Sequence, residues 1–390
     1  MQYQFPVIEH IDQVRAAIQD YPEFIVADRG HMLVVNYNVN LENTFGDPTD
    51  PQAQIRRECR GLKFDAQTGL IIARPYHKFF NVNERAETQA NSLNLAEPHQ
   101  ILEKLDGSMI HAVPVGREFR FCTKMGITDV SLPVEEFVVR NPRYYQLVRD
   151  MYELGTTAIF EWCSPQQRIV IDYGHDQLIL TAIRDTVTGV YWTYDNLSAI
   201  GTEYNVPVVG QLAGTMANME HLIAHTRDLV DVEGYVVRWA NGHMTKIKAD
   251  HYVLLHRTKD QVRLEKSVVE LLVSERADDV KPLLDSKDLE KFVQFENDFW
   301  RGVDQTTVQL EEVYARGNRY DSRRDFAVEF VNQQSAHLRP LLFSMRNGEQ
   351  ARDLVVKSIA SSTSSQTRID AARWLWGNHC WNGQIYIGDN

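Results

Sequence analysis

Hydrophobic positions recur with two different spacings along the chain. Up to about residue 253, most apolar residues alternate with polar ones or form short runs rich in β-branched and aromatic side chains, which is typical of β-strands. Turn sequences separate several of these runs and predict hairpins. The hairpin turns are expected at Thr68–Gly69, at residues 115–118 and at Asn241–Gly242.

Helical spacing is restricted to two places in this first part. Val7, Ile11, Val14 and Ile18 recur at helical intervals and predict a short helix over residues 6–20. Residues 133–154 predict a second helix that begins at Pro133. The remainder favours antiparallel sheets with flanking helices.

The pattern changes after about residue 255. Four segments then show helical periodicity with almost no hairpin signals: residues 266–275, 288–314, 323–334 and 350–360. We therefore predict an α+β protein with two domains, a mixed domain over 1–253 built on antiparallel sheets and an all-α domain over 254–390.

Composition narrows the possible environments and partners. The formal net charge of -12 argues against a protein that coats nucleic acid without regard to sequence, although a local cationic pocket remains compatible with it. No run of about 18 apolar residues occurs, so no membrane span is expected. The four cysteines form no CxxC pair, which argues against a zinc site and favours a reducing cytoplasm.

The sharpest chemical signal is Lys104 in the sequence EKLDGSM (103–109), between two predicted strands. Alone, such a lysine could belong to a surface turn. Other segments, however, place a charge beside or inside an apolar strand, where charges are seldom buried unless paired or bound to a ligand. These charges are Arg60, Lys78, Glu161, Glu233, Lys246 and Lys248.

Together these residues resemble the ordered motifs of covalent nucleotidyltransferases, which include DNA ligases, RNA ligases and mRNA capping enzymes. The motifs are Lys-x-Asp-Gly at 104–107, Glu161, EGYV at 233–236 and Lys-x-Lys at 246–248. The segments ECRG, RPYHKFFN, FEWCSPQQRIVI and KIKADHYVLLH are similar to the RNA ligase 1 family of T-even-type bacteriophages. This resemblance implies a phage-type, ATP-dependent RNA ligase with an N-terminal adenylyltransferase domain.

The resemblance also implies a chemistry. Lys104 would attack the α-phosphorus of ATP, with Mg²⁺ assisting, and hold AMP covalently. The AMP would pass to an RNA 5′-phosphate, which an RNA 3′-hydroxyl would then attack. Neighbouring cations such as Lys246 and Lys248 would favour the neutral, nucleophilic form of a lysine and stabilise charge on the phosphates.

Further roles are implied residue by residue. Glu233 is expected near the catalytic metal, and Glu161 at the ribose hydroxyls. Arg60 and Lys78 are expected at the phosphates. The remaining nucleotide contacts would come from Tyr37, Phe80, Gly107, Lys124 and Tyr252.

Two of these assignments, and one further acidic pair, have an ordinary alternative. Phe80 and Tyr252 could equally serve as core packing. Asp278 and Asp279 resemble an acidic pair that holds a divalent metal in the family's helical domain, but exposed acidic residues at a helix start also suit the helix dipole.

The helical second domain separates the possible enzymes. DNA ligases and capping enzymes of this superfamily carry an OB-fold after the Lys-x-Lys strand, and here helical spacing follows instead, so no OB-fold is expected. We therefore expect an RNA ligase acting on 5′-phosphate and 3′-hydroxyl ends, such as those of cleaved tRNA, with the helical domain selecting the RNA. No obligatory protein partner is indicated. The alternatives are a DNA-end ligase or capping-like enzyme and a non-catalytic nucleic-acid-binding protein.

Overall fold

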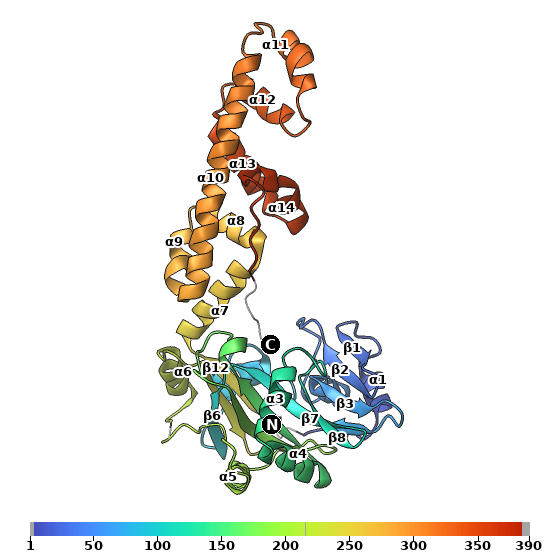
Figure 1. Ribbon diagram of the computed structural model, residues 1–390. Coiled ribbons are helices and arrows are strands. Elements are labelled where there is room, and N and C mark those ends of the chain that lie inside the picture. The colour runs from blue at the N-terminus through green and yellow to red at the C-terminus, as the bar shows by residue number, and fades with distance from the viewer. Residues whose placement is uncertain (1–3, 215, 384–390) are drawn as a thin grey trace. The chain divides into compact units, whose positions relative to one another are not determined.

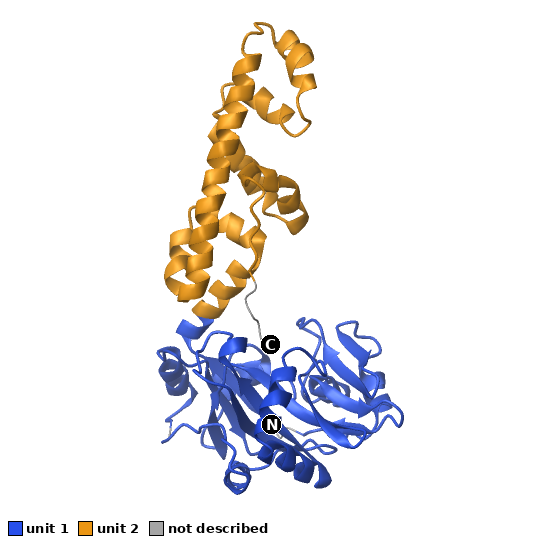
Figure 2. Cartoon of the chain, in the orientation of Figure 1, with its two compact units in different colours: residues 1–253, 386–390 blue, residues 254–385 orange. Residues whose placement is uncertain are grey.

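The computed structural model describes residues 4–214 and 216–383. The chain divides into two compact units, residues 1–253 and 254–385 (Figure 2). The first unit contains strands and helices, whereas the described residues of the second contain helices and no strand. This arrangement confirms the predicted α+β class with a helical C-terminal region. No helix in the described residues has the length and apolar character to cross a membrane.

Unit 1 is built on three four-stranded sheets (Figure 1). The first sheet has the order β1-β2-β3-β4, with strands Phe24–Asp28, Met32–Tyr37, Leu62–Asp65 and Ile71–Ala73. The second has the order β10-β9-β7-β8, with strands Gln177–Asp185, Thr156–Cys163, Ser108–Val115 and Glu118–Cys122. The third has the order β5-β12-β11-β6, with strands Phe80–Asn81, Met244–Lys248, Gly234–Trp239 and His99–Lys104. All pairings are antiparallel except β5 with β12.

Helices cover one face of the second and third sheets. α3 and α4 pack on the second sheet around Ile110, Phe160 and Leu180. α6 packs on the third sheet around Val237 and Ile247. Because successive side chains of a strand point to opposite faces, the other faces of these sheets are left to line a common cavity. The helices of unit 1 are α1 (Ile11–Ile18), α2 (Pro51–Glu58), α3 (Leu132–Arg140), α4 (Arg143–Glu153), α5 (Tyr194–Glu203) and α6 (Met219–Arg227), with short 3-10 turns at Ala86–Thr88, Ala90–Ser92 and Pro165–Gln167.

Two sequence predictions in unit 1 need correction. The helix expected over residues 133–154 is two helices, since α3 ends at Arg140 and α4 begins at Arg143. Pro142 separates them, because proline disfavours helical geometry in the residue before it. The region between residues 20 and 125, which showed a strand pattern, also contains α2. Its start is set by Asp50, whose carboxylate accepts hydrogen bonds from the backbone of Gln52 and Ala53, with Pro51 as the first helical residue.

Unit 2 is organised around one long helix. α10 runs over 32 residues, Ser286–Gly317, and buries Phe292, Phe299 and Val303 in a core shared with Trp376. The other helices are α7 (Asp250–Arg263), which begins in unit 1, α8 (Glu265–Val273), α9 (Ala277–Val280), α11 (Arg323–Asp325), α12 (Arg339–Arg346), α13 (Ala351–Ser362) and α14 (Gln366–Ala372). A π-helical segment covers Phe326–Phe330, and 3-10 turns occupy Lys281–Leu283, Val331–Gln333 and Arg373–Trp376.

Candidate active site

The register of the third sheet brings three sequence-predicted residues into one row. Gly234, the first residue of β11, pairs with Lys104 on β6 and with Lys248 on β12. Glu233 directly precedes Gly234. Its Oε1 atom lies 2.6 Å from Lys104 Nζ and 2.9 Å from Lys248 Nζ, so one carboxylate forms ion pairs with both lysines.

Burial makes this triad electrostatically unusual. The Glu233 side chain is only 2% exposed, whereas those of Lys104 and Lys248 are 18% and 24% exposed. Burial by itself would raise the pKa of Glu233, but the charges of Lys104 and Lys248 outweigh it and leave the pKa below its ordinary value. Glu233 is therefore an anion at neutral pH and keeps the two ammonium groups at one end of the sheet.

Lys246 belongs to the same cationic group. It lies two residues before Lys248 on β12, so the two side chains leave the strand on the same side. Burial lowers the pKa of Lys246 well below its ordinary value, and Lys104 and Lys78 lower it further. The side chain of Lys246 is therefore neutral in a larger fraction of the molecules than an exposed lysine would be at the same pH.

Glu161 approaches from the second sheet. It lies on β9 opposite Met109 of β7 and lines the same cavity as Lys104. Burial raises the pKa of Glu161 to about 8, opposed by the charge of Lys104 and assisted by that of Glu233. At neutral pH this carboxyl group is mostly protonated, so it can donate as well as accept a hydrogen bond.

The loop that follows Lys104 is held by Asp106. One carboxylate oxygen of Asp106 accepts hydrogen bonds from the backbone of Val170 and Ile171, each 2.7 Å long, and the other accepts one from the Tyr252 hydroxyl, also 2.7 Å long. Gly107 then passes so close to β9 that a Cβ atom on it would lie 2.3 Å from the Trp162 carbonyl oxygen. The Asp-Gly pair after the lysine thus fixes the loop and requires glycine at 107.

Lys78 lies among three aromatic rings. Its Nζ atom is 4.9 Å from the ring centre of Tyr37, 5.5 Å from that of Phe45 and 5.2 Å from that of Phe80, within the range of cation–π attraction. It also lies 3.3 Å from the Tyr37 hydroxyl oxygen. Burial would raise the pKa of Tyr37, but nearby cations, with Arg60 first among them, outweigh it and lower the pKa.

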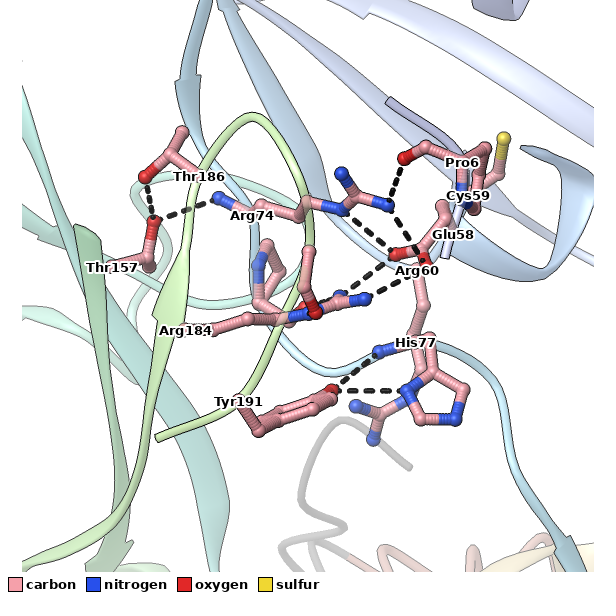
Figure 3. A network of polar contacts seen from close by, with 12 residues as sticks. Pro6, Glu58, Cys59, Arg60, Arg74, His77, Thr157, Arg184, Thr186 and Tyr191 are labelled. Atoms are coloured by element: carbon pink, nitrogen blue, oxygen red, sulfur yellow. Dashed lines mark hydrogen bonds and ion pairs between the residues drawn. The ribbon is translucent and has the colours of Figure 1, made fainter. Parts of the chain in front are cut away.

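A buried ionic network holds the segment that carries Arg60. Two residues earlier, Glu58 lies between the guanidinium groups of Arg74 and Arg184, with nitrogen–oxygen distances from 2.7 to 3.2 Å (Figure 3). Burial opposes the charge of Glu58, yet the two arginines lower its pKa below the ordinary value. Arg60 itself has Nη1 3.1 Å from Met109 Sδ and lines the cavity beside Lys104.

The cavity lies between the second and third sheets. Beyond the charged residues at Lys104, it is lined by Leu102, Val236 and Met244 from the third sheet and by Met109 and Thr181 from the second. The cavity is therefore charged at Lys104, and along its walls Arg238 joins the apolar side chains. A cavity of this kind can hold a nucleotide.

The predicted site residues do not all contact this cavity. Lys104, Arg60, Gly107, Glu161 and Glu233 line it. Phe80 is 1% exposed and packs in the core beneath Lys78, and Tyr252 is 2% exposed and braces Asp106. Lys124 is buried beside Gly61, whose missing Cβ would lie 2.7 Å from the Lys124 Cα atom.

Asp278 and Asp279 lie in unit 2, in the short helix α9. Asp278 forms an ion pair with Lys281 at 3.1 Å, and its side chain is 91% exposed. In the part of the chain that the structure describes, no group of three or more His, Cys, Asp or Glu side chains is arranged to hold a metal ion. A metal at this pair would have to take most of its ligands from water or from a bound substrate.

Sequence reasoning missed two residues of the site. Asp106 was seen only as part of the Lys-x-Asp-Gly pattern, and the three hydrogen-bond partners of its carboxylate lie 64 to 146 residues away. Arg238 is 4% exposed and lines the cavity from β11, two residues after Val236. Its position in the alternating pattern of an apolar strand was the available signal.

The sequence also matches known protein families and relatives. Residues 58–252 match the family described as RNA ligase, and residues 259–366 match the family described as T4 RNA ligase 1, C-terminal domain. The chain is 31% identical to the "Putative RNA ligase" of Thermovibrio ammonificans, over 66% of this chain and 67% of that protein. It is 25% identical to RNA ligase 1 of bacteriophage TS2126, over 46% of this chain and 47% of that enzyme.

Similar solved structures include an archaeal ATP-dependent RNA ligase, with 11% identity, 76% of this chain and 79% of that chain covered, and a TM-score of 0.45. The first family match spans half of the chain and includes the row of Lys104, Glu233 and Lys248, and the second lies within the helical unit. The chain belongs to the RNA ligase family and carries both the ligase domain and the C-terminal domain of the T4 RNA ligase 1 type.

Proposed function

We propose that this RNA ligase uses ATP, carries AMP covalently on Lys104 and joins an RNA 5′-phosphate to an RNA 3′-hydroxyl. The observation that supports this proposal best is the row formed by Lys104, Glu233 and Lys248 at the charged end of the cavity. This row holds the Lys104 amine at the cavity by a carboxylate 2.6 Å away, with Lys248 beside it to balance the negative charge of the phosphates.

The first step forms a phosphorus–nitrogen bond. The Lys104 amine attacks the α-phosphorus of ATP, the bond from that phosphorus to the bridging oxygen breaks, and pyrophosphate leaves. Lys104 must first lose a proton, and Glu233 Oε1, 2.6 Å from the amine, can accept it. Glu233 keeps the amine oriented toward the cavity through the ion pair.

The surrounding residues hold the nucleotide during this step. Arg60, Lys78 and Lys124 supply positive charge for the phosphates. The protonated carboxyl group of Glu161 can donate a hydrogen bond to a ribose hydroxyl, and the apolar walls at Leu102 and Val236 suit the base.

A Mg²⁺ ion fits this residue set. Glu233 Oε1 is held by ion pairs alone, so a hard cation can replace one ammonium group at this oxygen, and Mg²⁺ at phosphates is usually bound by one or two carboxylates. When bound, the ion would neutralise charge on the phosphates. We retain Asp278 and Asp279 as a second, weaker candidate for a metal in the helical unit.

The later steps move the AMP to RNA. The AMP passes from Lys104 to the RNA 5′-phosphate, and the RNA 3′-hydroxyl then attacks that phosphate and releases AMP. We propose that the helical unit contributes to the choice of RNA, with broken tRNA as the first substrate to test. All four cysteines are free thiols, which fits the proposed cytoplasmic compartment.

The test is to incubate the purified protein with Mg²⁺ and ATP labelled at the α-phosphate and to analyse it by denaturing electrophoresis. We expect a covalent label that is absent from Lys104→Ala and is transferred to 5′-phosphorylated RNA. Lys287→Ala, which changes an exposed lysine of the helical unit, is the matched control and should label normally.

Other outcomes would contradict the proposal in different ways. A label obtained with GTP but not with ATP would indicate capping-like chemistry. A label that transfers only to DNA ends would indicate a DNA-end ligase. A folded protein that is free of AMP and takes no label from either nucleotide would be a binding protein.

A further inference from the structure

Lys63 is a fully buried lysine outside the row of catalytic candidates. It lies on β3, its exposed fraction is 0%, and its Nζ atom makes three hydrogen bonds. It donates to the carbonyl oxygens of Gly61 at 2.7 Å, Thr123 at 3.1 Å and Lys124 at 3.2 Å. Among the described residues, no carboxylate lies within ion-pair distance of it. All three ammonium donors are thus used on backbone carbonyls.

These carbonyls belong to the two segments that carry predicted phosphate contacts. Gly61 follows Arg60, and Thr123 precedes Lys124. The segments touch, because a Cβ atom on Gly61 would lie 2.7 Å from the Lys124 Cα atom and 2.9 Å from its carbonyl oxygen. The three carbonyl oxygens all lie within 3.2 Å of Lys63 Nζ and therefore close to one another, where they repel unless a cation lies between them. The Lys63 ammonium occupies that place.

The lysine content of unit 1 supports a functional reading of this contact. Residues 1–253 contain only six lysines, at positions 63, 78, 104, 124, 246 and 248, and the other five are predicted site residues. The other positively charged side chains of this unit are arginines. A compact ammonium group with three donors suits the junction of three carbonyls, which the planar guanidinium of arginine would not.

We propose that Lys63 is a positioning residue whose ammonium group joins the Arg60 and Lys124 segments and thereby sets where these two cations meet the triphosphate. This inference rests on the proposed function, because it assumes that the site binds ATP. Lys63 itself contacts no substrate in this arrangement. Its effect passes through the backbone of Gly61 and Lys124.

The contact should depend on pH. Burial lowers the pKa of Lys63 to about 8, and the nearby Cys122 opposes this shift. Below pH 8 the ammonium donates to all three carbonyls. Above it the neutral amine keeps two donors and turns a lone pair toward the third carbonyl, so the junction weakens as the pH rises.

The other groups near Lys63 do not produce this transition. Burial raises the pKa of the Cys122 thiol to about 11, so it stays neutral. Burial and the charge of Lys63 lower the pKa of His111 well below its ordinary value, so it is neutral throughout. Glu161 titrates in the same range, but it is present in every variant of Lys63 and cancels in the comparison.

The test compares the ATP dependence of Lys104 adenylylation in the wild type and in Lys63→Met. At pH 7 we expect the half-saturating ATP concentration of Lys63→Met to rise about tenfold. This is the effect of losing one charge-assisted hydrogen bond between the triphosphate and a displaced Arg60 or Lys124. The rate at saturating ATP should change much less. At pH 9 the wild type should approach the variant, because its own Lys63 is then largely neutral.

Val34→Ala is the matched control for loss of packing. Val34 is 0% exposed and pairs with Lys63 across β2 and β3, so this variant weakens the same sheet without touching the three carbonyls. It should lower the melting temperature and leave the ATP dependence unchanged. If Lys63→Met does not fold, Lys63→Gln, which keeps two N–H donors but carries no charge, should need more ATP than the wild type at pH 7 and about the same amount at pH 9.

Two results would overturn the inference. One is a folded Lys63→Met, or in its place Lys63→Gln, with the ATP dependence of the wild type at pH 7. The other is an equal rise in Val34→Ala. In either case the wild type still becomes labelled, so the proposed function survives. A wild type that takes no label from ATP would instead refute the proposed function and this inference with it.

Discussion

The shared carboxylate of Glu233 leads to a quantitative prediction about stability. Glu233→Gln removes the anion from between two ammonium groups, whereas Lys104→Met leaves Glu233 with its second ion pair, 2.9 Å from Lys248. Removing one partner of a fully buried ion pair costs about 3–5 kcal/mol. Lys104 and Lys248 are 18% and 24% exposed and can regain water, so a smaller cost applies here.

We therefore expect Glu233→Gln to lower the free energy of unfolding of the third sheet by about 2–3 kcal/mol and Lys104→Met by about 1 kcal/mol. The double variant should lose less than the sum, because the neutral amide that replaces the carboxylate then faces one cation fewer. The expected coupling is about 1–2 kcal/mol, within the range measured for contacting charged residues. Lys248→Met should behave as Lys104→Met does, since both lysines contact the same oxygen.

The assay is native-state hydrogen exchange at increasing urea, followed in peptides from β6 and β11. It reports the free energy of opening for these strands in the full chain and does not require the two units to unfold together. The reasoning is refuted if the two single changes add within about 0.5 kcal/mol, which is the behaviour of independent sites. It is also refuted if Lys104→Met destabilises more than Glu233→Gln.

Three further changes test separate contacts of the site. Glu161→Gln should flatten the pH dependence of stability. The pKa of Glu161 is raised from 4.5 to about 8, so the wild type loses stability as the pH rises through this window, by at most about 1.4 kcal/mol per pH unit. Urea unfolding at pH 6 and pH 8 measures the difference, and an unchanged slope would contradict it. Tyr252→Phe removes a hydrogen bond to the Asp106 carboxylate. It should lower the melting temperature, and the free energy of unfolding should fall by about 1.5–3 kcal/mol. An unchanged melting temperature would mean that water replaces the hydroxyl. Gly234→Ala should prevent normal pairing of β11 and β12. Gly234 has φ of +140°, and a Cβ there would lie 2.0 Å from the Ile247 carbonyl oxygen. A soluble variant with wild-type hydrogen exchange in β12 would refute this prediction.

Local sequence signals predicted the elements better than their boundaries. The hairpin turns at Thr68–Gly69 and Asn241–Gly242 were correctly placed, because glycine in these turns adopts positive φ, 72° and 90°, which other residues avoid. The helix pattern over residues 133–154 was right in type, but hydrophobic spacing alone did not reveal the break at Pro142. Helix α2 was missed because its capping signal lies between two segments with a strong strand pattern.

The site could be predicted as a set of residues but not as a geometry. Lys104, Glu161, Glu233 and Lys248 were identifiable because charges in apolar strands need a reason to be there. Their arrangement depends on the order β5-β12-β11-β6, in which strands more than 100 residues apart become neighbours. Nothing local in the sequence specifies that pairing.

The missed contacts have a common physical cause. Asp106 and Lys63 act on backbone groups of distant segments, and a backbone carbonyl or N–H leaves no trace in the side-chain pattern. Phe80 and Tyr252 show the reverse case, in which residues with a recognisable sequence signal have a structural role. Both stand next to site residues, yet in this structure one packs in the core under Lys78 and the other supports the loop of Lys104.

The charge distribution reconciles an acidic protein with a polyanionic substrate. The net charge of -12 disfavours binding of RNA in general, whereas Arg60, Lys104 and Arg238 line one cavity and Lys248 shares the Glu233 carboxylate with Lys104. Such a protein gains little from binding along an RNA strand, because counterion release requires many phosphate contacts at once. A terminal phosphate, which carries more charge than an internal one and can enter a cavity, gains the most from a compact cationic site. The same net negative charge that disfavours sequence-independent coating is therefore compatible with the proposed action on RNA ends.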